Sequence, residues 1–193
     1  IIGILIFALV RWGIGINNTM IDMKGKAEKS WANVESSYQR RNDLIGNLVK
    51  TVQGAADFEK NTLTEVINAR AKATSTTIDA GNLTPEKMAA FQQAQSGLTS
   101  ALSKLMVVVE RYPDLKANQN FLQLQNQLEG TENRINVERN RFNTSAGAYN
   151  IYIKKIPRNF IASIAGFEGM SLYASDKGAD KAPDVNFDFN KKE

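Results

Sequence analysis

The most constraining feature of this sequence is a long stretch with almost no proline and a regular apolar rhythm. Between Asn17 and Pro157 the only prolines are Pro85 and Pro113. Apolar residues recur there at intervals of three and four, which is typical of helices that pack along one face. The most regular series runs Met88, Phe91, Gln95, Leu98, Leu102, Leu105, Val109 and Tyr112. The pattern therefore predicts an all-α protein whose helices meet along coiled-coil-like seams.

Turn signals divide this stretch into four expected helices. Gly54 interrupts the apolar spacing, Thr84-Pro85 has the residues of a capped helix start, and Pro113 ends one helix and opens the next. We expect helices over residues 17–54, 57–78, 85–111 and 115–156. Alternating directions would give a long antiparallel up-and-down four-helix bundle. Without a break at Gly54 the first helix would run about 90 Å and outreach its partners.

The first residues differ from the rest of the chain. Residues 1–10 read IIGILIFALV, and Arg11 is the only charge before Asp22. Since a bilayer core needs about 20 apolar residues, we interpret residues 1–16 as the end of a transmembrane helix that starts upstream. Arg11 and Trp12 would then lie at the membrane interface. A cleaved signal peptide or a buried core helix are the alternatives, but no small-residue cleavage site stands out before Lys24.

Composition limits the chemistry of the chain. It has no His and no Cys, which excludes disulfides, thiol nucleophiles, zinc–thiolate sites and His-based triads. The net charge of +4 is mild, and basic residues are not interleaved with aromatic ones as in single-strand binders. We therefore expect no enzyme activity, no cofactor, no metal and no nucleic-acid partner.

One polar residue interrupts the apolar seam of each expected helix. These residues are Arg41, Arg70, Gln95 and Glu132. With the turns near 54–57 and 111–115 at one end, all four fall at the same depth within about one helical turn, 5.4 Å. A buried, hydrogen-bonded ion pair that sets helix register is favoured over a ligand pocket, because two guanidiniums would satisfy the carboxylate. Glu59 and Arg139 are further candidate charges in the core.

The C-terminal part is expected to change character twice. The apolar run from Phe160 to Phe167 predicts a short helix or turn docked on the bundle. Residues 176–193 are polar, and Val185, Phe187 and Phe189 alternate within them, which predicts an extended tail. The tail would either add to the sheet edge of a partner or to a neighbouring copy, or form a loose terminus.

Four stretches carry a family resemblance. They are SWANVESSYQRRNDLIGNLVKTVQG (30–54), EKNTLTEVINARAKA (59–73), YPDLKANQNFLQLQNQLEGTENRINVERNRFN (112–143) and YNIYIKKIPRNFIASIAGF (149–167). Together they resemble the LemA family of bacterial membrane-anchored helical proteins. The resemblance implies a single N-terminal membrane helix and an up-and-down helical bundle, without enzyme activity or cofactor. Gly46 departs from the pattern, since the family more often has Pro there.

These observations predict three regions: a transmembrane anchor at 1–16, a LemA-like bundle at 17–175 and a polar tail at 176–193. The expected function is that of a non-enzymatic structural or scaffolding protein that self-associates at a membrane surface. The alternative is a membrane-tethered adaptor that recruits another protein through the bundle tip or the tail.

The expected partners are membrane lipid, further copies of the chain in a homo-oligomer, and an unidentified protein in the adaptor alternative. We expect a single-pass protein of the bacterial inner membrane with an extracytoplasmic, periplasmic bundle, because positive charge before a signal anchor usually stays inside. The candidates for contacts between copies are polar: Asn118, Gln119, Asn120, Gln123, Gln125, Asn126 and Gln127.

Overall fold

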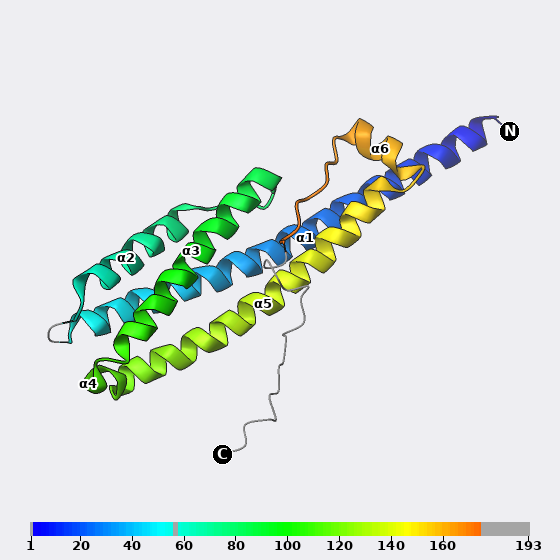
Figure 1. Ribbon diagram of the computed structural model, residues 1–193. Coiled ribbons are helices and arrows are strands. Elements are labelled where there is room, and N and C mark those ends of the chain that lie inside the picture. The colour runs from blue at the N-terminus through cyan, green and yellow to red at the C-terminus, as the bar shows by residue number, and fades with distance from the viewer. Residues whose placement is uncertain (1, 56–57, 175–193) are drawn as a thin grey trace, which may run out of the picture.

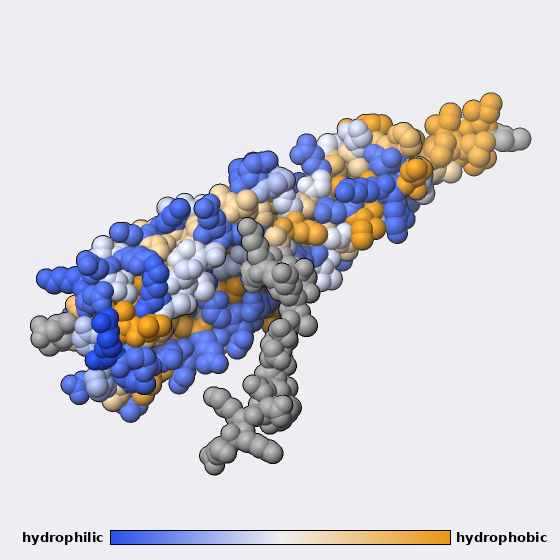
Figure 2. Space-filling model, in the orientation of Figure 1, coloured by the Kyte–Doolittle hydropathy of each residue, from blue (hydrophilic) through white to orange (hydrophobic). Residues whose placement is uncertain are grey.

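The computed structural model describes residues 2–55 and 58–174, and this part of the chain is all-helical apart from its turns and connecting segments. Its longest element, α1 (Ile2–Gln53), is one helix of 52 residues, about 78 Å long. The expected all-α class and the apolar N-terminal helix are confirmed. Residues 2–16, which belong to the expected anchor, and the helix expected from 17 form one continuous helix, because no proline separates them (Figure 1). Figure 2 shows the apolar start of α1 projecting beyond the body.

The long helix α5 (Gln119–Lys154) lies beside α1 along much of its length (Figure 1). The hydroxyls of Ser30 and Ser145 are 3.3 Å apart, and residue numbers rise along one helix as they fall along the other. Trp31 is fully buried in the seam, and its ring meets those of Phe91 and Phe142 edge-on with centroids 5.4 and 5.1 Å apart. These aromatic contacts join α1 and α5 to the helix that carries Phe91, α3 (Pro85–Val109).

The helices α2 (Lys60–Ser75) and α3 (Pro85–Val109) pack on each other beside the part of α1 farthest from the N-terminus (Figure 1). The break expected at Gly54 is confirmed, since α1 ends at Gln53. The helix expected over 57–78 is shorter, with α2 ending at Ser75. The chain leaves the helix there, and Ile78 is buried with its carbonyl accepting the Trp31 Nε1–H at 3.3 Å.

Capping residues account for the remaining boundaries. The start expected at Thr84-Pro85 is confirmed: Thr84 Oγ1 accepts from the backbone of Lys87 at 3.4 Å. The single helix expected over 115–156 is wrong, because α4 (Pro113–Lys116) and α5 are separate helices. Asn118 lies between them as the N-cap of α5, and its side chain accepts from the backbone N–H groups of residues 120 and 121 at 2.9 and 3.2 Å. Such short side chains favour a cap over helix continuation.

The chain after α5 returns over α1 and α5. The expected short helix is confirmed as α6 (Arg158–Ala165), which packs on both long helices. It ends at Gly166, whose φ of 72° is left-handed and suits glycine. An extended segment, residues 167–174, then runs along α5; we call it the strap. The alternating residues expected at Val185, Phe187 and Phe189 lie outside the described residues.

Buried apolar side chains form two clusters at successive levels of the body. One contains Trp31, Phe91 and Phe142, and the other contains Leu48, Leu98 and Leu105. On α1 the clusters are separated at Arg41, between Tyr38 and Leu44. On α3 they are separated at Gln95, between Phe91 and Leu98, and on α5 at Glu132, between Leu128 and Ile135. The core is therefore divided at one level by polar residues.

Candidate functional site

Arg41 is the centre of this polar layer. It is only 2% exposed, and its terminal nitrogens donate to Glu132 Oε1 at 2.9 Å and to Gln95 Oε1 at 2.5 Å. One of them also donates to Thr99 Oγ1 at 3.3 Å. Gln95 Nε2 donates to the carbonyl of Ala73 at 3.3 Å, which extends the network to α2. Side chains from α1, α3 and α5 and the backbone of α2 thus meet at one level.

The charges of the layer are unevenly buried. The Arg41 side chain is 3% exposed, whereas that of Glu132 is 40% exposed. The carboxylate lies at the edge of the seam because the neighbouring Thr131 and Ile135 occupy the buried positions of α5. A hydrated anion compensates the buried cation without the desolvation cost of a fully buried pair. The hydrogen bonds of the layer are therefore better explained as contacts that set the register of the helices than as a site that binds a charged ligand.

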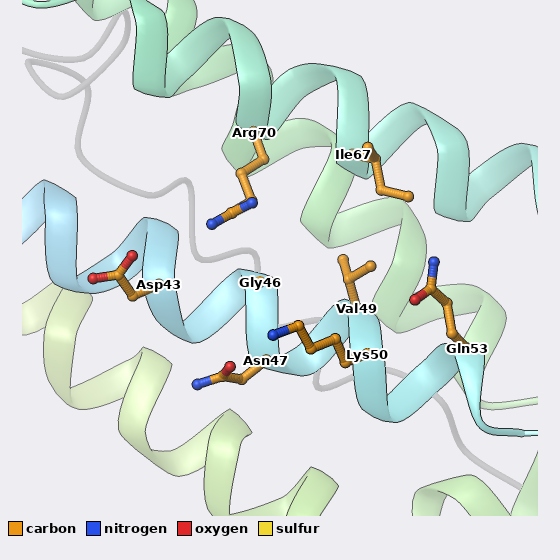
Figure 3. A pocket seen from close by; sticks show the side chains of 8 residues that line it. All are labelled: Asp43, Gly46, Asn47, Val49, Lys50, Gln53, Ile67 and Arg70. Carbon is orange, nitrogen blue, oxygen red and sulfur yellow. The ribbon is translucent and has the colours of Figure 1, made fainter.

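Arg70 lies beside the layer and does not complete it. Its side chain crosses from α2 to α1, where Nε donates to the backbone carbonyl of Asn42 at 2.7 Å. Figure 3 shows the guanidinium next to Gly46. A Cβ at residue 46 would lie 2.9 Å from Arg70 Nη2 and 3.0 Å from Cζ. The missing side chain of Gly46 therefore makes room for the Arg70 guanidinium, which contacts the backbone of α1 and not the side chains of the polar layer.

The two further charges expected in the core are both partly exposed. Glu59 precedes α2, and its Oε2 accepts from Arg111 Nη2 at 2.7 Å, which joins two turns at one end of the body. The Arg139 guanidinium lies 3.9 Å from the ring centroid of Tyr173 and donates to the carbonyl of Ala174 at 3.4 Å. Arg139 therefore holds the strap and does not belong to the polar layer.

The buried acid of α5 is Glu138, which the sequence analysis missed. It is 4% exposed and accepts from Arg141 Nη1 at 2.9 Å. A series through Ile135 and Phe142 passes equally well through position 138 or 139, since both choices give steps of three and four. Spacing alone therefore could not distinguish the buried acid from its basic neighbour.

A tyrosine pair that the sequence did not reveal joins the strap to α1. The hydroxyls of Tyr38 and Tyr173 are 2.6 Å apart in a buried position. Burial raises the pKa of both hydroxyls above the ordinary value, although the nearby guanidiniums of Arg41 and Arg139 act in the opposite direction. Both tyrosines are therefore held in the neutral, hydrogen-bonding form.

Two asparagines of α5 hold the strap in the manner of a sheet ladder. Asn150 donates from Nδ2 to the carbonyl of Met170 and accepts from its N–H, both at 2.8 Å. Asn143 does the same for Tyr173, at 3.0 and 2.8 Å. The asparagines are seven residues, or about two helical turns, apart and therefore lie on one face of α5.

The N-terminal end of α1 is exposed and apolar. An 18-residue window of α1 has a mean hydropathy of 1.5, and only 11% of it is buried, so most of this stretch lies outside the core that the rest of α1 helps to form. Arg11 and Trp12 are both exposed there. By length and composition the helix is able to cross a membrane.

The described residues hold no cluster of three metal-ligating side chains. A groove beside Arg70 is lined by Asp43, Lys50 and Gln53 of α1 and by Ile67 of α2, and it is open to solvent (Figure 3). A second groove lies between α1 and α5. Both grooves are open to solvent and have a mixed polar and apolar lining, so neither is an enclosed apolar cavity of the kind that holds small molecules.

Comparison with known proteins gives matches over most of the chain. The model of the LemA family matches residues 30–187. Magnetosome protein MamQ 1 of Paramagnetospirillum magneticum is 29% identical over 187 residues, covering 86% of this chain and 67% of the relative. The MamQ of Magnetospirillum gryphiswaldense gives the same values. Protein LemA of Metamycoplasma hominis is 22% identical over 176 residues, covering 91% of this chain and 75% of the relative.

Proposed function

The chain belongs to the LemA family, and we propose that it is a non-enzymatic scaffolding protein, anchored in a membrane, that self-associates through its helical body. In this proposal α1 begins as a single transmembrane helix. The body of α1 together with α2, α3 and α5 acts as an antiparallel up-and-down bundle on the extracytoplasmic side of a bacterial inner membrane. The names of the relatives state no enzymatic reaction, which agrees with the absence of His and Cys from the chain.

The observation that carries the anchoring is the exposure of the first turns of α1. Ile2, Phe7 and Leu9 are 75%, 67% and 64% exposed. Contiguous exposed apolar surface of this kind is unfavourable in water and favourable in the acyl region of a bilayer. The same helix continues as the longest element of the body, so the anchor and body are rigidly connected.

The surface proposed for self-association is the groove between α1 and α5, which we call the α1–α5 groove. It has two hollows lined by these two helices alone. One hollow is lined by Ser30, Val137, Asn140, Arg141, Thr144 and Ser145, and the other mainly by Asn33, Ser36, Arg40, Asp43, Asn47, Gln127 and Arg134. Both charge signs and many amides are present, so a second copy would find complementary partners in a wet interface.

Anchoring in a membrane allows such a polar contact to be sufficient for self-association. Copies held in one membrane share an orientation and a high effective concentration, so a weak lateral contact forms without a large apolar interface. Of the polar residues expected to mediate contacts, Gln127 lies in this groove. Asn118 is used as the α5 cap.

The test is the mass of the assembly after mild extraction, measured by single-particle mass methods and imaging. Asn33→Arg with Asn140→Arg places like charges in the groove, and we expect oligomers to dissociate. Ser96→Arg with Ser103→Arg on the exposed face of α3 is the matched control and should leave the mass unchanged. A monomeric parent protein, or a groove variant with unchanged mass, would refute this function. The adaptor alternative rests mainly on residues 176–193 and stays a prediction.

A further inference from the structure

The outer side of α6 carries a stripe of large apolar side chains. Phe160 and Ile164 are one turn apart on the same side of the helix, and Ile156, two residues before the helix, is exposed as well. They are 64%, 89% and 79% exposed. On the inner side Ala162 is buried and Ile161 packs against the core. A helix on a water-exposed surface normally presents polar groups outward, so this stripe is the reverse of the expected pattern.

The stripe belongs to a helix that is held firmly in place. The left-handed residue Gly166 closes α6, and Phe167 N–H returns to the carbonyl of Ala162 at 2.9 Å. Tyr149 Oη then donates to the carbonyl of Glu168 at 2.8 Å, ahead of the asparagine ladder. The apolar side chains are therefore presented outward by a fixed element.

The position of α6 indicates what covers it. Ala162 belongs to the same apolar cluster as Ile16 and Met20 of α1. These residues directly follow the exposed apolar start of α1, which carries Trp12. Figure 2 shows apolar side chains gathered at this end of the molecule, from the tip of α1 to the region of α6. The stripe therefore lies at the same end of the molecule as the exposed apolar start of α1.

The charged residues next to the apolar stripe of α6 are basic, as expected for a helix that binds an anionic phospholipid surface. Lys154 and Lys155 are exposed at the end of α5, immediately before the stripe. Arg158 opens α6, with its guanidinium 4.2 Å from the ring centroid of Tyr152. Basic residues next to an apolar helix face bind anionic headgroups while the apolar side chains enter the acyl boundary.

We propose that α6 is an interfacial membrane helix that rests on the same leaflet from which α1 emerges. Ile156, Phe160 and Ile164 insert at the acyl boundary, and the three basic residues contact lipid phosphates. With eight residues, about 12 Å, α6 is too short to cross the bilayer and lies along its surface. This inference rests on the proposed anchoring of α1, and it adds a second contact that fixes the tilt and rotation of the body.

Single cysteines test the inference cleanly, because the natural chain has none. Phe160→Cys and Ile164→Cys in the full chain are labelled with an environment-sensitive dye and reconstituted into vesicles of phosphatidylcholine and phosphatidylglycerol. Leu9→Cys reports the anchor, and Ser103→Cys on the exposed face of α3 is the control in water. Quenching by doxyl-labelled lipid and by aqueous iodide is measured for each.

We expect the labels at 160 and 164 to shift to the blue, to lose emission with doxyl lipid and to resist iodide, while the label at 103 shows the reverse. Lys154→Gln with Lys155→Gln should reduce the lipid quenching of the label at 164 in anionic vesicles. Iodide access at 160 and 164 would overturn the inference. Protection that depends on protein density without lipid quenching would also overturn it, since a second copy would then cover α6. A label at residue 9 outside the lipid would instead refute the anchoring itself.

Discussion

The contact between Arg70 and Gly46 allows a prediction whose sign depends on one neighbouring side chain. Replacing a helical glycine by alanine normally stabilises a protein by about 0.5–1 kcal/mol. Here the new Cβ would lie 2.9 Å from Arg70 Nη2, so the guanidinium must move. It would then lose its 2.7 Å hydrogen bond to the carbonyl of Asn42. A bond from a charged donor is worth about 1.5–3 kcal/mol, and the half-buried position favours the lower value.

We therefore expect Gly46→Ala to destabilise the parent protein by about 0.5–1 kcal/mol, the difference between these two effects. In an Arg70→Ala background the same change should stabilise by about 1 kcal/mol, because nothing remains to be displaced. The coupling in a double-mutant cycle is thus about 1.5 kcal/mol. Gly130→Ala is the matched control in α5, where a Cβ meets nothing within 4 Å, and it should stabilise in both backgrounds.

The assay is reversible urea unfolding in mild detergent, followed by the fluorescence of the buried Trp31 and by helical circular dichroism. A Gly46→Ala effect that is the same with and without Arg70, within about 0.3–0.5 kcal/mol, would refute the close contact. A destabilisation by Gly130→Ala would show that glycine serves helix flexibility in this protein, and the effect at residue 46 would then need no steric cause.

Three further outcomes are expected. Glu132→Ala leaves the buried Arg41 charge without its carboxylate partner and should lower the free energy of unfolding by about 3–5 kcal/mol. Arg41→Met leaves only the partly exposed carboxylate of Glu132 and should lower it less. Equal losses of stability in urea unfolding would contradict the uneven burial of the two charges. Burial raises the pKa of Tyr38 and Tyr173 above the ordinary value of 10.0, so the folded protein keeps protons that the unfolded chain loses, and stability should fall as pH rises past 10. That fall should shrink when both are replaced by Phe. Asn150→Ala should speed hydrogen exchange in the strap while α5 keeps its protection.

Sequence reasoning succeeded where one helix face determines the outcome. Arg41, Gln95 and Glu132 interrupt apolar seams, and the structure brings them into contact because seams of packed helices lie in register. The same reasoning could not assign their burial, since spacing identifies a stripe but not its edge. Glu132 proved to lie at the edge, and the choice between positions 138 and 139 was open for the same reason.

The contacts made by irregular segments such as the strap could not be predicted from apolar spacing. The strap has no periodicity of its own, and its bonds join residues far apart in the chain. Asn143 and Asn150 show a helical spacing, but polar residues on a helix face most often meet water. Only the path of the chain after Gly166 shows that their side chains bind backbone.

The polar layer and the strap together explain why this fold tolerates a buried cation. Apolar residues in place of a buried ion pair are often at least as stable, so stability alone does not account for Arg41. Two helices with repeating apolar seams can pack equally well after a shift of two turns, and apolar contacts oppose that shift weakly. Arg41 opposes it strongly, because only one register places Glu132 and Gln95 within reach. The strap contacts, from Asn143 and Asn150 to the pair of Tyr38 with Tyr173, form only in that register. A fixed register also keeps α6 level with the end of the apolar anchor, where a shift of two turns, about 10 Å, would move it off the membrane surface.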